Sequence, residues 1–331
     1  MPGSRAVTLV TGGAGFIGSH LVERLLESGH SVRVVDNLST GNTENLAAVA
    51  GEIDFLPGDL REAAVCRQAV RDVELVFHVA ALPSVPRSLD DPWGSHDANV
   101  NATLRLLIAC TEAGVRRIIY SSSSSAYGDA PVLPKVESAE PLPRSPYAAA
   151  KLAGELYVLA FARAGSVEGV ALRYFNVFGP RQDPHSAYAA AIPAFLSAAY
   201  EGRPAVVFGD GRQTRDFTYV ANVVDANLLA AQAPPRASGT VTNVGAGEQT
   251  SLLELLDLIR DVTGRDLVHT CRPARVGDVR DSVASLERAG RVLGYRPTVS
   301  LREGLHRTWE WFVDTQRSGA GVQTASLAAP A

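Results

Sequence analysis

The sequence predicts an α/β protein: a doubly wound parallel sheet of the Rossmann type with a smaller mixed α/β lobe. Two observations lead to this prediction. Short apolar β runs alternate with helical segments through the first half of the chain, and a glycine-rich turn joins the first run to the first helix. Strands separated by helices imply right-handed crossovers, which produce a parallel sheet covered on both faces.

The first half of the chain contains six predicted strands, at residues 6–10, 31–35, 53–56, 75–79, 117–120 and 170–174. Apolar positions with helical spacing predict helices at 16–27, 63–70 and 98–113. The first of these helices ends before Gly29, a residue that suits the left-handed conformation that often follows a helix.

The second half is less regular, with predicted helices at 189–200, 220–232, 252–262 and 301–315 and strands at 205–208 and 240–243. Because 331 residues exceed what one hydrophobic core usually supports, we expect a Rossmann domain at 1–175 and a second lobe at 176–315 that is partly interleaved with it. The tail at 316–331 is rich in Gly, Ser and Ala without periodicity, which predicts disorder.

Composition narrows the classes of function. The net charge of -4, without a basic run, argues against a surface for nucleic acid or anionic membrane. Cys66, Cys110 and Cys271 lack CxxC spacing, which indicates reduced thiols in a reducing compartment. No apolar run reaches the ~18 residues of a membrane span, and the histidines lack metal-ligand spacing. We therefore expect a cytoplasmic protein without a metal.

The glycine-rich turn predicts a phosphate-binding site. Gly12, Gly15 and Gly18 stand three residues apart between the first predicted strand and the first helix. Glycines in this place permit a tight turn and a close approach of the backbone to a pyrophosphate, and the helix N-terminus offers free N–H groups.

An acidic residue at the end of the second predicted strand completes a dinucleotide site. Asp36 stands where a carboxylate binds the hydroxyls of an adenosine ribose. This favours NAD over NADP, although Arg33 lies close in sequence. Asp59 and Leu60 follow the third strand, where the edge of the adenine is expected.

Tyr147 and Lys151 stand four residues apart at the start of a predicted helix, which Ser145 as N-cap and Pro146 as first helical residue mark. A lysine one turn away favours the phenolate form of a tyrosine. The serines at 121–125 end the fifth strand, at the edge where open parallel sheets bind ligands. Together these residues predict a group that removes a proton from a hydroxyl.

Taken together, the motifs resemble the extended short-chain dehydrogenase/reductase superfamily and, within it, the UDP-hexose 4-epimerases, most closely the subgroup for UDP-N-acetylglucosamine (UDP-GlcNAc). The resemblance extends from the glycine turn to about Trp311. It rests on TGGAGFIGSHL, Asp36, GDL at 58–60, HVAA at 78–81, SSSSSAYGD, SPYAAAK, RYFNVFGPRQDP, RDFTYV and RVGDVRDS.

This resemblance implies that Tyr147 is the base for the sugar 4-hydroxyl, that Ser123 holds the oxygen and that Lys151 binds the nicotinamide ribose. It also implies a homodimer formed by the helices before Cys110 and after Lys151. The residues implied in NAD binding are Gly12, Gly15, Phe16, Ile17, Gly18, Asp36, Asn37, Asp59, Leu60, Ala80, Ala81, Asn99, Ser121, Tyr147, Lys151 and Tyr174.

The resemblance also implies how a UDP-sugar is bound. Arg215 and Arg275 match arginines that grip the diphosphate, Asp278 matches a ligand of the uridine ribose, and Phe208 lies near the uracil. Ser282 is small where a tyrosine would exclude an N-acetyl group at the sugar C2. We therefore expect interconversion of UDP-GlcNAc and UDP-GalNAc, and also of UDP-Glc and UDP-Gal. The implied substrate set is Ser84, Ser122, Ser123, Tyr147, Asn176, Gln182, Ala190, Phe208, Arg215, Arg275, Asp278 and Ser282.

Other reactions stay open as alternatives. Dehydratases and decarboxylases of the superfamily carry acidic residues after the serine, where this chain has Ser124 and Ser125. Uronate 4-epimerases tend to have a threonine in place of Asn176 and a cation nearby, where this chain has Asp183. A net nucleotide-sugar oxidoreductase and a non-catalytic NAD-binding sensor are the remaining alternatives.

Overall fold

The computed structural model describes residues 7–184, 190–274 and 279–317. A seven-stranded sheet dominates it, and all its strands are parallel. The order of the first six strands is that of a doubly wound fold, so the predicted fold class is confirmed. From one edge to the other the strands are β11 (Thr240–Val244), β6 (Glu168–Tyr174), β5 (Arg117–Ser123), β4 (Val73–His78), β1 (Val7–Thr11), β2 (Ser31–Asp36) and β3 (Ile53–Pro57).

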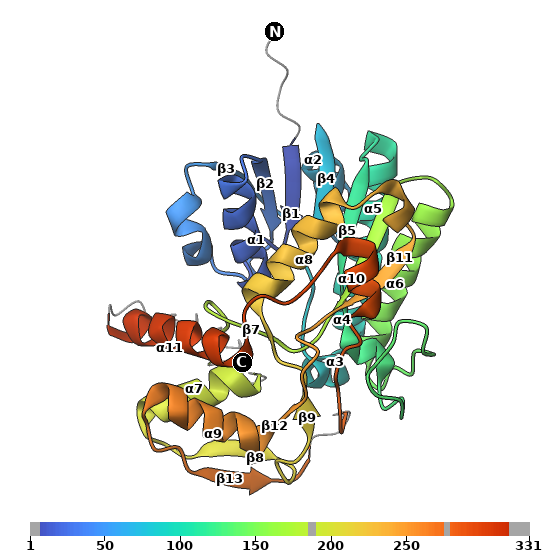
Figure 1. Cartoon of the computed structure of the whole chain (residues 1–331). Coiled ribbons are helices and arrows are strands. Elements are labelled where there is room, and N and C mark those ends of the chain that lie inside the picture. Colours follow the sequence, from blue (N-terminus) through green and yellow to red (C-terminus); the bar gives the residue numbers. More distant parts are fainter. Residues whose placement is uncertain (1–6, 185–189, 275–278, 318–331) are drawn as a thin grey trace, which may run out of the picture.

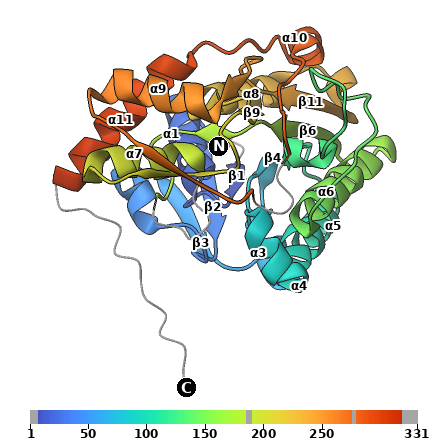
Figure 2. The same cartoon turned by 90° about the horizontal axis from the view of Figure 1, so that it is seen from below.

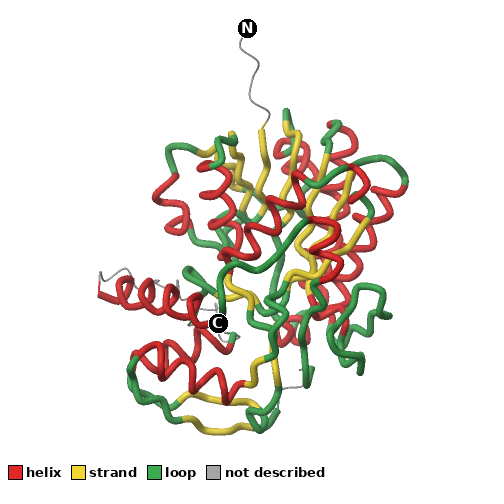
Figure 3. Tube along the Cα trace, viewed as in Figure 1, coloured by secondary structure: helices red, strands yellow, loops and turns green. Residues whose placement is uncertain are grey.

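Helices cover both faces of the sheet, and each face has its own hydrophobic core (Figures 1 and 3). One face packs against α1 (Phe16–Glu27), α8 (Val220–Gln232) and α10 (Glu287–Leu293). The other packs against α2 (Ala63–Ala69), α5 (Ala102–Ala113) and α6 (Pro146–Arg163). Burial on both faces explains why the strands read as continuous apolar runs rather than as alternating patterns.

The second lobe has a separate core between three helices and a strand pair (Figure 1). The sheet strands run from the N-terminal end toward this lobe, so their carboxyl ends face it (Figure 1). The lobe contains α7 (Ala191–Glu201), α9 (Leu252–Thr263) and α11 (Leu301–Arg317), the parallel strands β8 (Ala205–Phe208) and β13 (His269–Arg272), the antiparallel pair β9 (Thr214–Arg215) and β12 (Thr250–Ser251), and the parallel pair β7 (Val177–Phe178) and β10 (Thr218–Tyr219).

Several short elements were not predicted from the sequence. Figure 2 shows two of them, α3 and α4, beside α5 and α6. They are η1 (Thr43–Val49), α3 (Val85–Asp90), α4 (Pro92–His96), η3 (Ser124–Tyr127), η4 (Pro235–Ala237), α10 and the short strands β7, β9, β10, β12 and β13. The helix predicted at 98–113 is α5, preceded by the π-helical turn η2 (Asp97–Asn101).

The predicted long elements are present, with three differences of detail. β11 pairs with β6 in the main sheet, because α8 packs on the sheet and returns the chain to its edge. The helix predicted at 189–200 begins at Ala191. Gln316 and Arg317 belong to α11, whereas the rest of the predicted disordered tail lies outside the described residues. The boundary at 175 between the two lobes stays a prediction.

Among the residues that the structure describes, no helix combines the length and the apolar character that crossing a membrane requires.

Candidate active site

The glycine turn is tightly packed at the carboxyl end of β1. Gly12 has a φ of +68°, and a Cβ there would lie 2.7 Å from the Cα of Ala80. At Gly18 a Cβ would lie 2.1 Å from the carbonyl oxygen of Gly12. The first turn of α1 contains no acidic residue, and its N-cap is Gly15. The backbone N–H groups at this helix end therefore suit a pyrophosphate, and the turn fits NAD.

Asp36 lies beside this turn, at the end of β2. Its Oδ2 accepts a hydrogen bond from the Ala14 N–H (3.0 Å) and its Oδ1 accepts one from the Leu38 N–H (2.8 Å). Burial raises the pKa of Asp36, and these two donors act in the opposite direction. Arg33 donates to Asp54 Oδ2 (2.6 Å) and to two backbone carbonyls. The position of Asp36 agrees with a site for ribose hydroxyls. Arg33 does not bond to Asp36, since its guanidinium donates to Asp54 and to the two carbonyls.

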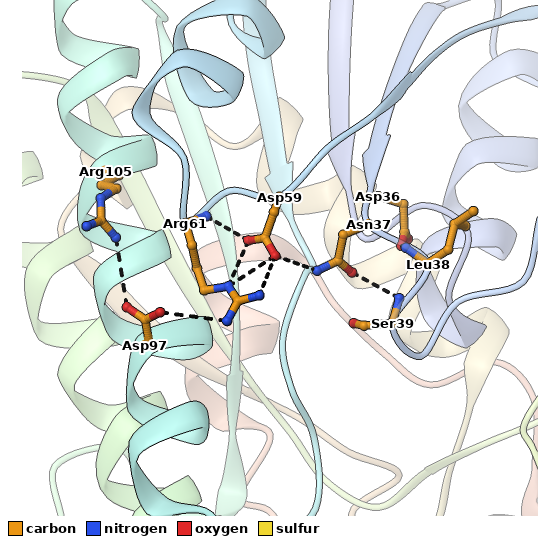
Figure 4. A network of polar contacts seen from close by, with 8 residues as sticks. All are labelled: Asp36, Asn37, Leu38, Ser39, Asp59, Arg61, Asp97 and Arg105. Atoms are coloured by element: carbon orange, nitrogen blue, oxygen red, sulfur yellow. Dashed lines mark hydrogen bonds and ion pairs between the residues drawn. The ribbon is translucent and has the colours of Figure 1, made fainter. Parts of the chain in front are cut away.

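A network of polar contacts joins the residues around Asp59, which the sequence assigns to the adenine edge (Figure 4). Asp59 Oδ2 accepts hydrogen bonds from Arg61 Nη2 (2.7 Å) and Asn37 Nδ2 (2.8 Å). The bond with Arg61 is the main reason that the pKa of Asp59 is lowered to about 2. Asp97 Oδ2 lies 3.8 Å from Arg61 Nη1, and Asp97 Oδ1 lies 3.9 Å from Arg105 Nη1. The sequence pointed to Asp59 and Asn37 but missed Arg61, which directly follows the GDL motif.

Asn99 connects the π-helical turn η2 with the loop after β4. Its Oδ1 accepts from the Leu82 N–H (2.9 Å), and its Nδ2 donates to the Leu82 carbonyl (3.1 Å). The same loop carries Ala80 and Ala81, and the Ala80 N–H donates to Thr11 Oγ1 (3.1 Å). The buried amide of Asn99 thus fixes the loop that lies against the glycine turn, and a direct contact with NAD stays a prediction.

The start of α6 brings the three predicted catalytic residues together. Ser145 Oγ accepts a hydrogen bond from the Ala148 N–H (3.1 Å), so the helix begins where the sequence predicts. This places Tyr147 in the first turn and Lys151 in the second. Ser123, the last residue of β5, forms a side-chain hydrogen bond with Tyr147. A phenol, an amine and a hydroxyl therefore lie at the carboxyl edge of the sheet.

Burial controls the proton affinity of both helix residues. It raises the pKa of Tyr147, and the hydrogen bond with Ser123 acts in the opposite direction. It lowers the pKa of Lys151 to about 7, while the charge of Glu155 acts in the opposite direction. Lys151 Nζ lies 4.6 Å from the centroid of the Tyr120 ring. Desolvation of the phenol outweighs the contact with Ser123, so the pKa of Tyr147 lies above its usual value, and the role of Lys151 in favouring the phenolate stays a prediction.

Two other serines of the run bond to the protein interior. Ser121 Oγ and the Tyr174 hydroxyl share a hydrogen bond of 3.0 Å. Ser122 Oγ donates to Glu155 Oε2 (2.6 Å), and Glu155 forms a buried ion pair with Arg173 (2.6 Å). The sequence reasoning missed this pair, although Glu155 stands four residues after Lys151 on one helix face. The cofactor and substrate roles of Ser121, Tyr174 and Ser122 stay predictions.

Four predicted substrate residues lie on separate elements. Ser84 has a φ of +108° and caps α3 with its hydroxyl, which accepts from the Arg87 N–H (3.2 Å). Gln182 Nε2 donates to the Val177 carbonyl (3.2 Å). Ala190 is exposed and precedes α7, and Phe208 ends β8. The hydrogen bonds of Ser84 and Gln182 hold their own segments and do not connect the two.

A second group of predicted substrate residues lies around the buried residue Asp216. The carbonyl of Asp216 accepts from Asn176 Nδ2 (3.2 Å), and Arg215 is its neighbour in the chain. Asp216 Oδ2 accepts from the Ala284 N–H (3.0 Å), two residues after the buried Ser282. The sequence did not single out Asp216, although it stands within the RDFTYV motif. The predicted Arg275 and Asp278 lie outside the described residues.

Comparison with known proteins places this site among related ones. The model of the "NAD dependent epimerase/dehydratase family" matches residues 8–245. UDP-glucose 4-epimerase of Mycolicibacterium smegmatis is 42% identical over 309 residues, which cover 92% of this chain and 98% of that protein.

Two solved structures are similar in both sequence and fold. UDP-N-acetylglucosamine 4-epimerase from Methanobrevibacter ruminantium, in complex with UDP-N-acetylmuramic acid, is 39% identical with a TM-score of 0.89, over 95% of this chain and 100% of that one. UDP-glucuronic acid 4-epimerase from Bacillus cereus, in complex with UDP-glucuronic acid and NAD, is 31% identical with a TM-score of 0.87, over 93% of this chain and 99% of that one.

Proposed function

Since the chain belongs to the NAD-dependent epimerase/dehydratase family, we propose that it interconverts UDP-GlcNAc and UDP-GalNAc, and also UDP-Glc and UDP-Gal, by inverting C4 of the sugar. The family, the isomerase class and NAD as cofactor, all predicted from the motifs, are confirmed by these similarities. The identity of the sugar is the part that is proposed.

The observation that carries the reaction is the hydrogen bond between Ser123 and Tyr147 at the carboxyl edge of the sheet. Bound NAD supplies the acceptor for the hydride from C4. The phenol of Tyr147 takes the proton of the 4-hydroxyl, and Ser123 holds the sugar oxygen while the carbon changes geometry. Because burial raises the Tyr147 pKa, the phenolate needs positive charge nearby, and Lys151 provides it in its protonated form.

Inversion requires the 4-keto sugar to turn over while it stays bound. A tether at the diphosphate allows this motion, because the sugar rotates about its link to the phosphate. Arg215 is the described residue proposed for this tether, since a guanidinium binds phosphate oxygens through paired donors. Return of the hydride to the opposite face would complete the inversion, and Tyr147 would give its proton back to the 4-oxygen.

The small side chain of Ser282 supports the choice of N-acetylated sugars. Ser282 is 8% exposed, and the segment around it is hydrogen-bonded to the residue that follows Arg215. A Ser282→Tyr variant should lower kcat/KM for UDP-GlcNAc about 10- to 100-fold relative to UDP-Glc, because the ring fills the space of the N-acetyl group. An unchanged ratio would remove this residue as the size filter.

The decisive experiment is incubation of the purified protein with UDP-Glc, UDP-GlcNAc, UDP-glucuronate and their galacto epimers, followed by separation of the products. Turnover of UDP-GlcNAc and UDP-Glc without net NADH supports the proposal. Turnover of UDP-glucuronate alone would replace it with the uronate reaction, and stoichiometric NADH would indicate a net oxidoreductase.

We further propose a homodimer through α5 and α6. These neighbouring helices expose the apolar residues Ile108, Leu156 and Tyr157. A Leu156→Asp variant should be monomeric in light scattering after gel filtration, because a charge would be buried in the contact. Val268→Asp changes an equally exposed apolar residue of the second lobe and should leave the dimer intact. A dimeric Leu156→Asp variant would place the contact elsewhere.

A further inference from the structure

Asp216 is a fully buried carboxylate at the meeting point of three chain segments. Its Oδ1 accepts a hydrogen bond from the Ala246 N–H (2.7 Å), and its Oδ2 accepts from the N–H groups of Gly247 (3.0 Å) and Ala284 (3.0 Å). Thr218 Oγ1 makes a longer contact of 3.4 Å. Within the described part of the chain no cation pairs with Asp216. Three backbone N–H groups and the more distant Thr218 hydroxyl therefore compensate its charge, and all three segments depend on it.

The segment at 281–285 is held from two sides. At its start, Asp281 Oδ1 accepts from Thr214 Oγ1 (2.6 Å), and Ala284 is bound by Asp216 as described. On the other side, Lys135 exchanges backbone hydrogen bonds of 2.8 and 2.9 Å with the residues before and after Ala284. Ser282 lies between these attachment points, so its position follows from theirs.

The proposed diphosphate contact is attached to the same place. Arg215 directly precedes Asp216, and its Nη1 donates to the carbonyl of Arg280 (3.2 Å), just before the segment at 281–285. Asn176 donates to the carbonyl of Asp216 from the end of the main sheet. Figure 1 shows that β9, which carries Arg215, lies below the sheet at the edge of the second lobe. Asp216 thus lies between Arg215 in the chain and the segment with Ser282, and both are attached to it.

Packing leaves little freedom at this joint. A Cβ added to Gly245 would lie 2.6 Å from Asp216 Oδ2 and 2.7 Å from the Cβ of Ala284. Because real Cβ atoms do not approach other atoms so closely, an alanine at this position must push Asp216 and Ala284 apart. The fit between these two residues is therefore tight on the side of β11 as well.

We propose that Asp216 is a positioning residue that sets the selectivity for the C2 substituent of the sugar, by fixing the segment with Ser282 relative to Arg215. This inference rests on the proposed function, since it requires that Ser282 lines the sugar pocket. Asp216 itself touches neither sugar nor cofactor in this scheme. It acts through the backbone of residues 281–285.

The test compares kcat/KM for UDP-GlcNAc with kcat/KM for UDP-Glc in variants of the full-length enzyme with NAD bound. Asp216→Asn keeps the shape but replaces one oxygen with an N–H donor, so at least one backbone N–H loses its acceptor. Gly245→Ala separates the same residues without changing a charge. Both variants should change the ratio about fivefold or more. Partial unfolding lowers both values equally, so it does not move the ratio.

Matched variants make the result interpretable. Thr218→Val removes only the longest contact of Asp216 and should leave the ratio within about twofold of the wild type. Thr214→Val, at a half-exposed position, releases the segment at Asp281 and serves if Asp216→Asn does not fold. If the folded Asp216→Asn and Gly245→Ala variants keep the wild-type ratio of kcat/KM for UDP-GlcNAc to kcat/KM for UDP-Glc, the inference is overturned. This holds whether or not Ser282→Tyr changes that ratio. Absence of turnover of any UDP-sugar by the wild type overturns the proposed function instead.

Discussion

Lys151 and Asp216 are both buried ionisable residues, but the protein surrounds them differently. Lys151 is 3% exposed and lies over an aromatic ring near the edge of the sheet, one turn from Tyr147. Asp216 is 0% exposed and accepts three backbone N–H donors. Burial favours the neutral form of each: it lowers the pKa of Lys151 to about 7 and raises that of Asp216 to about 6.

The different surroundings of Lys151 and Asp216 fit the different roles that we propose for them: Lys151 acts in the chemistry, and Asp216 positions chain segments. At α6 burial brings the pKa of Lys151 to about 7 beside the phenol that we propose as the base, so a change in the protonation of Lys151 should alter the chemistry. The carboxylate oxygens of Asp216 accept hydrogen bonds from backbone N–H groups. A substitution of Asp216 should therefore change the spacing of the chain segments that carry these groups. The same desolvation therefore serves reactivity in one region and geometry in the other.

Loss of the phenol should have the largest effect. Tyr147→Phe removes the proton acceptor but keeps the ring, so we expect kcat to fall about 10²- to 10⁴-fold while the KM for UDP-GlcNAc changes little. Tyr157→Phe alters a 38% exposed tyrosine of the same helix and should retain activity. If Tyr147→Phe keeps more than about a tenth of the wild-type kcat, the base lies elsewhere and the contrast between the two regions fails.

Lys151 should make stability rise with pH above neutral. The unfolded chain keeps the proton of this lysine up to its ordinary pKa of 10.5, whereas the folded protein releases it near 7. Between these values the unfolded state binds more protons, so the free energy of unfolding rises by up to about 1.4 kcal/mol per pH unit. Urea unfolding of wild type and Lys151→Met between pH 7 and 10 measures the difference. Parallel curves would show that Lys151 is not desolvated.

Asp216 should give the opposite slope over a narrower range. Its pKa is about 6 in the folded protein against an ordinary value of 3.8, so the folded state binds more protons between these values. The free energy of unfolding therefore falls as pH rises through this range, by up to about 1.4 kcal/mol per pH unit. Asp216→Asn should abolish this part of the curve. A wild-type curve that matches the variant would mean that the N–H donors fully compensate the burial.

Local signals in the sequence were sufficient for the long helices that cover the main sheet. The bounds of α1 and α8 agree with prediction to the residue, because apolar spacing and turn residues define both ends. Ser145 gave the start of α6 in the same way. In the second lobe, β13 is exposed along its whole length and exists through pairing with β8, far away in the chain. Short strands of this kind have no local pattern to detect.

Short capped helices escaped prediction for a related reason. The five residues of α4 are too few to show a periodicity, and the helix depends on Asp91, whose Oδ1 accepts from the Gly94 N–H (2.8 Å). Only one member of the ion pair between Asp59 and Arg61 was predicted, since the sequence indicated the carboxylate but not the arginine.

By itself the sequence determined the fold class, because strands alternating with helices have a local pattern. It also predicted the NAD site at the glycine turn and the pair Tyr147 and Lys151 from short motifs with a local physical meaning, and Ser123 from the family resemblance. Only the tertiary structure decided the proton affinities, since the desolvation that shifts Tyr147, Lys151 and Asp216 comes from residues distant in the chain. It also decided the place of Ser282, because the carboxylate that holds its segment stands more than sixty residues earlier and meets it only after folding.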